Sequence, residues 1–260
     1  MILAHRVALN GVQLDELDER INIKSVAPGA GKDSISAEAP GTQDGNRITG
    51  RRRDTLDIVV KFSMVIGPDE LRERVNLLEK INAWAAGGGW LTVNYKENRQ
   101  VLVVCAQAPG EGDAFEWTTV YQITFRAYSV PFWTDVAETA VKSKVAGSGS
   151  MTISVPGSAE TVADVTVENK SGMTINNLSL TIAGKTMTFS GLNLGGSQKL
   201  IIDHLQTADL YVFRARIGST SVLGKRTGAD EFRVKPGDRG ISFSADRAVQ
   251  VTVGVRGRYV

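Results

Sequence analysis

The chain has 260 residues, of which 42% are hydrophobic and 22% charged, and its formal net charge is +2 at pH 7. This composition is typical of a soluble globular protein with one large domain or two ordinary ones. The small net charge does not indicate a sequence-specific nucleic-acid partner, and no apolar run approaches the ~18 residues of a membrane span. Cys105 is the only cysteine, which excludes an intrachain disulfide and fits assembly in a reducing cytoplasm.

The first 53 residues contain a predicted hairpin followed by a long polar stretch. Asn10-Gly11, between short apolar runs, is a strong two-residue hairpin signal. Residues 24–53 are rich in Gly, Ala, Pro, Ser and Asp and hold almost no large apolar side chain. A stretch of this length without secondary structure is uncommon inside a compact domain. It is either a solvated loop with a basic end or a long arm that orders on a neighbouring subunit. We favour the arm, whose expected oligomer-interface residues are Arg47, Arg51, Arg52 and Arg53, because guanidinium groups bind carboxylates bidentately.

Residues 53–133 predict long alternating strands with one amphipathic helix between them. From Leu56 to Ile66, apolar residues occupy every second position, which is the period of a strand with one buried face. Gly67-Pro68 ends this strand, and a helix is expected over about residues 68–86. A second alternating run covers residues 115–127. The helix is expected to form the core scaffold against the sheet through Leu71, Val75, Leu78 and Trp84.

The composition changes after Trp133, since all four tryptophans precede this point or occupy it. Residues 141–150 are mostly small and polar and predict a linker. This linker would join an N-terminal domain at residues 1–140 to a second domain at residues 151–260. Short strand patterns then recur with turn signals about every eight to twelve residues, which is typical of a sandwich or jelly roll. The sequence therefore predicts a mainly β protein, with a β-barrel-like sheet domain that carries one α-helix, followed by a β-sandwich.

No catalytic motif is recognisable in the sequence. It holds no Gly-rich phosphate loop, no dinucleotide fingerprint and no paired-Cys or His-Glu-x-x-His metal spacing. Only His5 and His204 could serve as imidazole bases. Asp203 and His204 point to opposite faces of a predicted strand, and no Gly-x-Ser-x-Gly elbow supplies a nucleophile. The neighbouring carboxylates at residues 15–19 are predicted to form a solvated turn. We therefore expect no catalytic residues, no metal and no cofactor.

A structural role is the first hypothesis for this chain, and two functions remain as alternatives to it. Jelly rolls often bind carbohydrate, so a lectin-like carbohydrate-binding module is the second hypothesis. The predicted second domain holds no tryptophan that could provide a stacking platform for a sugar ring, which weakens this hypothesis. A hydrolase is the third hypothesis.

The chain also carries a series of motifs in a characteristic order. They are Pro40-Gly41-Thr42-Gln43-Asp44-Gly45, Glu70-Leu71-Arg72 with Trp84, Ile123-Thr124-Phe125, Pro131-Phe132-Trp133, Pro236-Gly237-Asp238, Ile241-Ser242-Phe243 and Arg256-Gly257-Arg258-Tyr259. In this order they resemble the distal tail protein family of long-tailed, non-contractile (siphovirus-type) bacteriophages and prophages, over nearly the whole chain.

The resemblance implies a ring-forming N-terminal domain and a galectin-like C-terminal β-sandwich. It implies a homo-oligomer, a hexameric ring, at the junction of the tail tube and the tip. The partners expected from it are the tail tube protein, the tail hub and the tape-measure protein, with receptor-binding or side-fibre proteins on the second domain. The expected location is the virion tail tip, after assembly in the bacterial cytoplasm.

Overall fold

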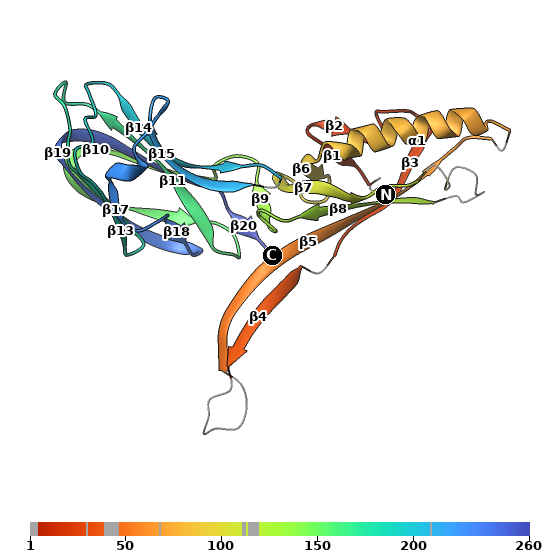
Figure 1. Cartoon of the computed structure of the whole chain (residues 1–260), viewed down its shortest axis with the longest axis horizontal. Helices are drawn as coiled ribbons and strands as arrows, with labels where there is room; N and C mark the ends of the chain where they lie inside the picture. Colours follow the sequence, from red (N-terminus) through yellow and green to blue (C-terminus); the bar gives the residue numbers. More distant parts are fainter. Residues whose placement is uncertain are drawn as a thin grey trace. The chain divides into compact units, whose positions relative to one another are not determined.

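The computed structural model describes residues 5–29, 31–38, 47–67, 69–110, 113, 120–208 and 210–260. Contacts divide the chain into two compact units. The first unit comprises Met1–Trp133 with Thr207–Leu210, and the second comprises Thr134–Gln206 with Tyr211–Val260. The fold is mainly β, as the sequence predicts, with a single α-helix in the described ranges (Figure 1).

The first unit is an antiparallel sheet with one helix along one face (Figure 1). The strand order is β2-β1-β6-β7-β8-β5-β3, and β4 pairs with β5 outside this path. The elements are β1 (Val7–Leu9), β2 (Val12–Gln13), β3 (Ile21–Pro28), β4 (Lys32–Glu38), β5 (Arg47–Met64), α1 (Leu71–Ala86), β6 (Gly89–Val93), β7 (Arg99–Gln107) and β8 (Tyr121–Ala127). Of the second predicted alternating run, Tyr121–Ala127 is strand β8, and residues 115–119 lie outside the described residues.

The predicted hairpin at Asn10-Gly11 is confirmed. Asn10 and Gly11 both have positive φ, at 52° and 84°, as a type I′ turn requires. The Asn10 side chain also fastens the hairpin to the next strand. Its Nδ2 donates to Gly88 O at 2.9 Å, and its Oδ1 accepts from Trp90 N at 2.9 Å. This clamp needs a glycine at position 89, because a Cβ there would lie 2.1 Å from Asn10 Oδ1.

The helix begins three residues later than expected and turns a slightly different face to the core. Its buried residues are Arg74, Leu77, Leu78, Ile81 and Ala85. The prediction that Leu71 belongs to the core is wrong, because Leu71 is 37% exposed. Arg74 is buried near the start of the helix instead, and its Nη2 donates to the carbonyls of Ile66 and Gly67 at 3.4 and 3.2 Å.

The other three expected scaffold residues occupy different depths. Leu78 is only 3% exposed. Val75 and Trp84 are half-buried. Trp84 nevertheless has specific contacts, since its ring lies edge-on to Phe125 and its Nε1 donates to Val12 O at 3.1 Å. The helix is therefore held to the sheet by aliphatic packing along its middle and by one indole hydrogen bond near its end.

A bidentate ion pair joins the neighbouring strands β5 and β8 of the first unit, between side chains that alternate with the buried ones. Asp57 in β5 lies directly opposite Arg126 in β8. Arg126 donates through Nε and Nη2 to the two carboxylate oxygens of Asp57, at 2.5 and 2.9 Å. This bidentate hydrogen bonding holds the pKa of Asp57 below its ordinary value.

The second unit is an antiparallel β-sandwich formed from one continuous set of strands. The path is β16-β15-β14-β11-β19-β12-β13-β17, with β10 on β19 and β18 on β11. The strands are β10 (Ala140–Val155), β11 (Thr161–Asn169), β12 (Leu178–Ile182), β13 (Lys185–Phe189), β14 (Lys199–Gln206), β15 (Tyr211–Ile217), β16 (Thr220–Ser221), β17 (Arg226–Gly228), β18 (Arg233–Val234), β19 (Gly237–Val255) and β20 (Arg258–Tyr259). A short 3-10 helix, η1 (Leu223–Lys225), precedes β17, and β9 (Trp133–Asp135) crosses the boundary between the units.

The prediction of a linker at residues 141–150 is wrong. These residues belong to β10, which pairs with β19 from Ala140 opposite Val255 to Val155 opposite Gly237. A single register shift between Ala146 and Ser148 interrupts the pairing. Because backbone hydrogen bonds need no particular side chain, glycine and serine can line an edge strand whose residues are mostly exposed. The boundary between the units accordingly falls between residues 133 and 134, ahead of the predicted position.

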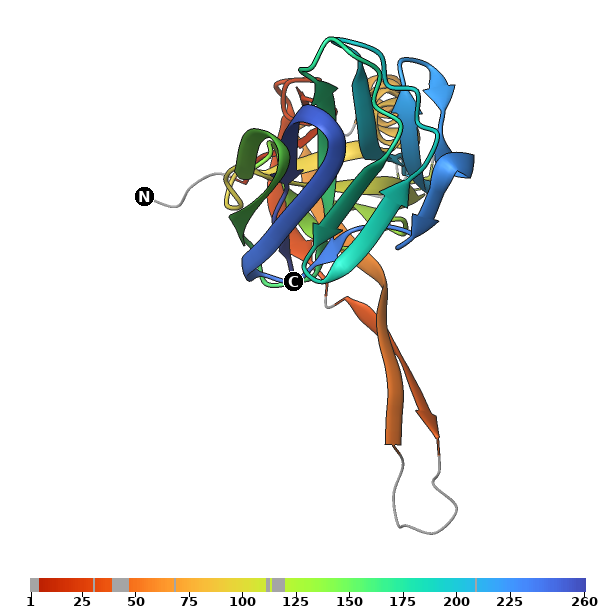
Figure 2. The same ribbon diagram turned by 90° about the vertical axis from the view of Figure 1, so that its left-hand side faces the viewer.

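Strand β19 shapes the second unit. The sequence predicts two separate strands here, but they form one strand of 19 residues. Its first half pairs with β12 and its second half with β11, while β10 follows its other side throughout (Figure 2). The inward side chains of these strands, among them Val165, Val251, Val253 and Ile241, form one buried core with Phe189 and Phe232.

Leu78→Ala should lower the free energy of unfolding of the first unit by about 2–5 kcal/mol, the range for a leucine removed from a packed core. Leu71→Ala is a matched control on the same helix and should change it by less than about 0.5 kcal/mol. Urea unfolding followed by tryptophan fluorescence measures both, because all four tryptophans belong to the first unit. Equal losses for the two variants would contradict the assigned helix face.

Asp57→Asn should weaken the acid sensitivity of the first unit. The folded pKa of Asp57 lies below its unfolded value of about 3.9. Its contribution to stability is therefore present above about pH 4 and is lost as the pH falls through the folded pKa. The free energy of unfolding, measured by fluorescence between pH 6 and pH 2, should fall less steeply for Asp57→Asn than for the parent.

Arg126→Gln should flatten the same acid limb, since Arg126 is the main cause of the shift. Parent-like slopes in both variants would contradict the assigned cause.

Candidate assembly surface

Strand β4 and the first half of β5 leave the sheet of the first unit as a two-stranded arm (Figures 1 and 2). The pairing runs from Lys32 opposite Thr55 to Glu38 opposite Arg47, and residues 39–46, which include the motif at residues 40–45, lie outside the described residues. The expectation that residues 24–53 have no secondary structure is therefore wrong for the strands at each end of this stretch. The arm itself, one of the two interpretations of this stretch, is present as a β-ribbon.

The arm has two faces of different character. Residues directly opposite each other in paired strands share a face, and neighbours along a strand alternate. One face carries Ile35 and Ala37 from β4, with Arg51 opposite Ile35 and Ile48 opposite Ala37. Ile35 and Ile48 are 58% and 64% exposed. The opposite face carries Ser34 and Ser36, so the two exposed isoleucines of the described arm lie on one face.

The arginines expected at an interface differ in exposure and in the groups that they contact. Arg53 is turned inward, with only 14% of its side chain exposed, and its Nε lies 3.3 Å from Asp33 Oδ1. Its guanidinium group also lies over the Phe132 ring, 5.4 Å from the centroid. These contacts all lie within the first unit, and the assignment of Arg53 to an intersubunit contact stays a prediction.

Arg52 behaves differently from its neighbour. Its side chain is 82% exposed, and its Nε contacts Asp54 Oδ1 at 2.8 Å. The hydroxyl of Ser34 donates to the same carboxylate, and these two hydrogen bonds hold the pKa of Asp54 below its ordinary value. The backbones of Arg47 and Arg51 lie in β5, and their side chains are outside the described residues. Alternation along β5 is the reason that adjacent arginines have separate surroundings.

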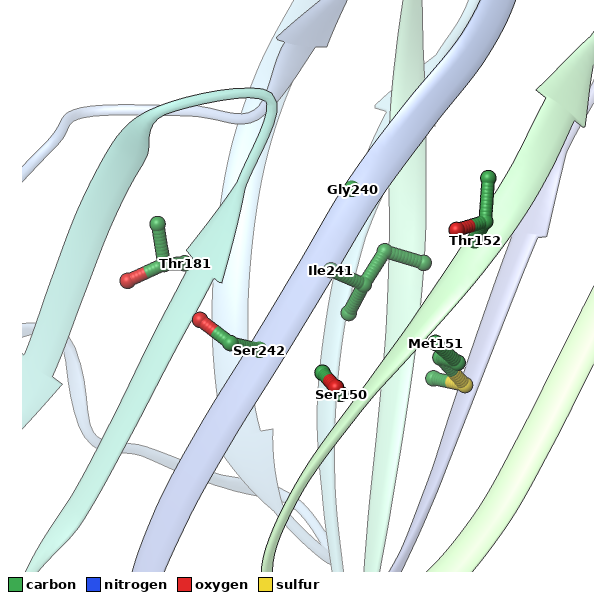
Figure 3. Close-up of a pocket in the computed structure, with 7 residues that line it drawn as sticks. All are labelled: Ser150, Met151, Thr152, Thr181, Gly240, Ile241 and Ser242. Carbon is green, nitrogen blue, oxygen red and sulfur yellow. The ribbon is translucent and has the colours of Figure 1, made fainter.

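The second unit has a shallow hollow of about 570 Å³ on β10, β12 and β19. Seven residues line it, namely Ser150, Met151, Thr152, Thr181, Gly240, Ile241 and Ser242 (Figure 3). None of these seven is charged or aromatic. The hollow therefore offers hydroxyl groups but no acid–base pair for catalysis and no ring for a sugar to stack upon.

His204 lies in β14 as part of a buried polar cluster in the second unit. Its Nδ1 is 3.1 Å from Asp164 Oδ1, its Nε2 is 3.4 Å from Glu231 Oε2, and its ring stacks on Tyr211. Burial raises the pKa of Tyr211 to about 12, so its phenol stays protonated at neutral pH. The adjacent Asp203 accepts instead from Arg214 at 2.8 Å. The histidine is enclosed by carboxylates and aromatic rings, an arrangement that lacks a nucleophile.

The described residues show neither a metal-binding cluster nor a membrane-spanning helix. They contain no group of three or more His, Cys, Asp or Glu side chains placed to hold a metal ion. Among them, no helix combines the length and the apolar composition that crossing a membrane requires.

Comparison with known proteins finds similarity in structure only. No family model matches the sequence, and no curated protein matches it. The Dit protein (gp 19.1) of phage SPP1 has a similar structure, with a TM-score of 0.67 and 10% sequence identity over 98% of this chain and 99% of that chain. That protein is described as a paradigm of the hub adsorption apparatus of phages that infect Gram-positive bacteria.

Two chains of phage p2 baseplates match less well. A chain of the baseplate in its activated conformation with Ca gives a TM-score of 0.47 at 9% identity over 99% of this chain and 98% of that chain. A chain of the baseplate with Sr gives 0.44 at 8% identity, with 97% of each chain covered. The fold is thus similar to that of the SPP1 Dit protein over nearly the whole chain.

The intact protein should show no binding above background on a glycan array. The reason is that the hollow in Figure 3 has no aromatic platform and no charged group to orient a sugar. A reproducible glycan signal that is lost in Ser242→Arg, which fills the hollow from its exposed wall, would contradict this expectation.

Proposed function

We propose that this protein is a structural component of a bacteriophage tail tip. In this role it is a distal tail protein that forms a ring, joins the tail tube to the tip or baseplate, and serves as a docking hub for host-adsorption proteins. The observation that carries the proposal is the similarity in fold to the SPP1 Dit protein over 98% of this chain. The order of motifs along the sequence supports the same family independently of the fold.

The arm supports assembly into a closed ring. A two-stranded ribbon is at best marginally stable alone in water, and ordering its backbone costs about 1–2 kcal/mol per residue. This arm also exposes Ile35 and Ile48 on one face. Packing that face on a second copy of the chain would bury both isoleucines and offset part of the ordering cost. Head-to-tail contacts of this kind close into a ring when the rotation between subunits permits it.

The number of subunits and the partners come from the family resemblance. We propose a homohexamer that contacts the tail tube protein, the tail hub and the tape-measure protein. The second unit, for which a galectin-like fold remains a prediction, would carry receptor-binding or side-fibre proteins. The protein would act at the virion tail tip after assembly in the cytoplasm of the host, and without catalysis, metal or cofactor.

Light scattering coupled to size exclusion at high protein concentration tests the ring and the arm together. The parent should elute with six times the mass of the 28.0 kDa monomer. Ile35→Asp and Ile48→Asp should each shift the protein toward monomer, because a charged group would replace apolar surface that the proposed contact buries.

Ser36→Asp is the matched control, since it places the same charge on the opposite face of the arm, and it should assemble as the parent does. If Ile35→Asp and Ile48→Asp both assemble as fully as Ser36→Asp, this face of the arm is not the contact. A monomeric parent at every concentration would count against the ring itself.

A further inference from the structure

The base of the arm is a place where the chain could bend. Strand β3 pairs with β5 as far as Pro28 opposite Ile58, and β4 resumes pairing on the same strand at Lys32 opposite Thr55. Gly29 N still donates to Asp57 O at 2.7 Å, so the described pairing stops after Gly29 and resumes at Lys32. On the β5 side, a register shift next to Lys32 leaves Asp54 as an extra residue. The extra residue makes β5 irregular at this level, and a paired ribbon can bend at such a bulge.

Arg53 spans this irregular level. It belongs to β5, and its partner Asp33 belongs to β4, so the ion pair fastens the two arm strands together just beyond the break. A Cβ at position 31 would lie 2.7 Å from Arg53 Nε and 2.8 Å from its Cζ. The guanidinium group therefore lies directly against the Gly31 backbone, and a side chain at position 31 would displace it.

The third contact of Arg53 ties the arm to the body of the first unit. Its guanidinium lies over Phe132, which follows β8 and is far from the arm in sequence. This segment is firmly placed, because Val130 and Trp133 are buried and Phe132 N donates to Val130 O at 2.8 Å. A planar cation on an aromatic face resists rotation as well as displacement.

We propose that Arg53, Asp33 and Phe132 form a lock that fixes the direction of the arm in the free subunit. Arg53 is the positioning residue of this lock. The arm therefore already has its binding orientation when it meets a neighbouring copy of the chain. The consequence for assembly rests on the proposed ring, whereas the lock itself is a property of the single chain.

Arg52 provides an internal comparison for the lock. It is adjacent to Arg53 and carries the same charge, but its side chain is 82% exposed and its ion pair is with Asp54 on its own strand. Removing Arg52 therefore deletes a charge from the arm and leaves the contacts of Arg53 in place.

Distance measurement by double electron–electron resonance tests the lock directly. Spin labels are attached at Ser36 on the arm and Gln122 on β8, both exposed, in the full chain with Cys105→Ser and at concentrations where light scattering reports monomer. The parent and Arg52→Ala should each give one narrow distance distribution. Arg53→Ala should lose this narrow peak, and Arg53→Lys should broaden it, because an ammonium group keeps the charge without the planar stacking.

The outcomes separate the lock from the ring. A narrow, parent-like peak in both Arg53→Ala and Arg53→Lys would overturn the lock, as would equal broadening in Arg52→Ala. Circular dichroism checks that each variant is folded. If Arg53→Ala does not fold, the comparison of Arg53→Lys with the parent still tests the lock. In light scattering, Arg53→Ala should raise the concentration needed for half-assembly by roughly ten-fold, because preorganisation is lost. A monomeric parent with a narrow peak would leave the lock intact and remove only its role in a ring.

Discussion

Strand β5 belongs to two environments, and the first unit depends on how it passes from one to the other. Between Leu56 and Phe62 its inward side chains are buried, with β3 and β8 paired on either side. Between Arg47 and Asp54 the same strand pairs with β4, and Ile48 is 64% exposed. The transition is held by polar contacts rather than by apolar packing. Arg126 fixes Asp57 at the edge of the core, and Arg53 fastens the base of the arm.

Patterns that come from burial could be predicted from the sequence, and structure that depends on backbone pairing alone could not. The alternating part of β5 and the turn at Asn10-Gly11 have the periodicity or the dihedral requirements that their structures impose. Strands β4 and β10 carry no such pattern, because they are exposed along most of their length. Glycine and serine in β10 resemble a linker, although its backbone is paired with β19 on both sides of one register shift. The sequence misplaces the helix phase because Arg74, a residue expected in solvent, takes a buried position beside backbone carbonyls.

Only part of the candidate assembly surface could likewise be predicted from the sequence. The sequence indicates an arm and marks its arginines, because a long polar stretch between ordered segments is unusual. It does not distinguish Arg52 from Arg53, since alternation separates them only once the register of β5 is known. Phe132 could not be connected with the arm from sequence, because the contact joins segments nearly eighty residues apart. Ile35 and Ile48, two large apolar residues in an otherwise small and polar stretch, are the available signal for an apolar face.

The lock changes the energetics expected of an assembling arm. If the arm were free to swing, each intersubunit contact would have to supply the cost of orienting it, and that cost would recur at every interface of a ring. Contacts within the chain remove most of this cost before assembly, because Arg53 holds β4 and β5 against the Phe132 segment. The apolar face carrying Ile35 can then contribute its burial almost entirely to association. A modest contact repeated around a closed ring is sufficient under these conditions, since closure pairs every arm with a receiving surface.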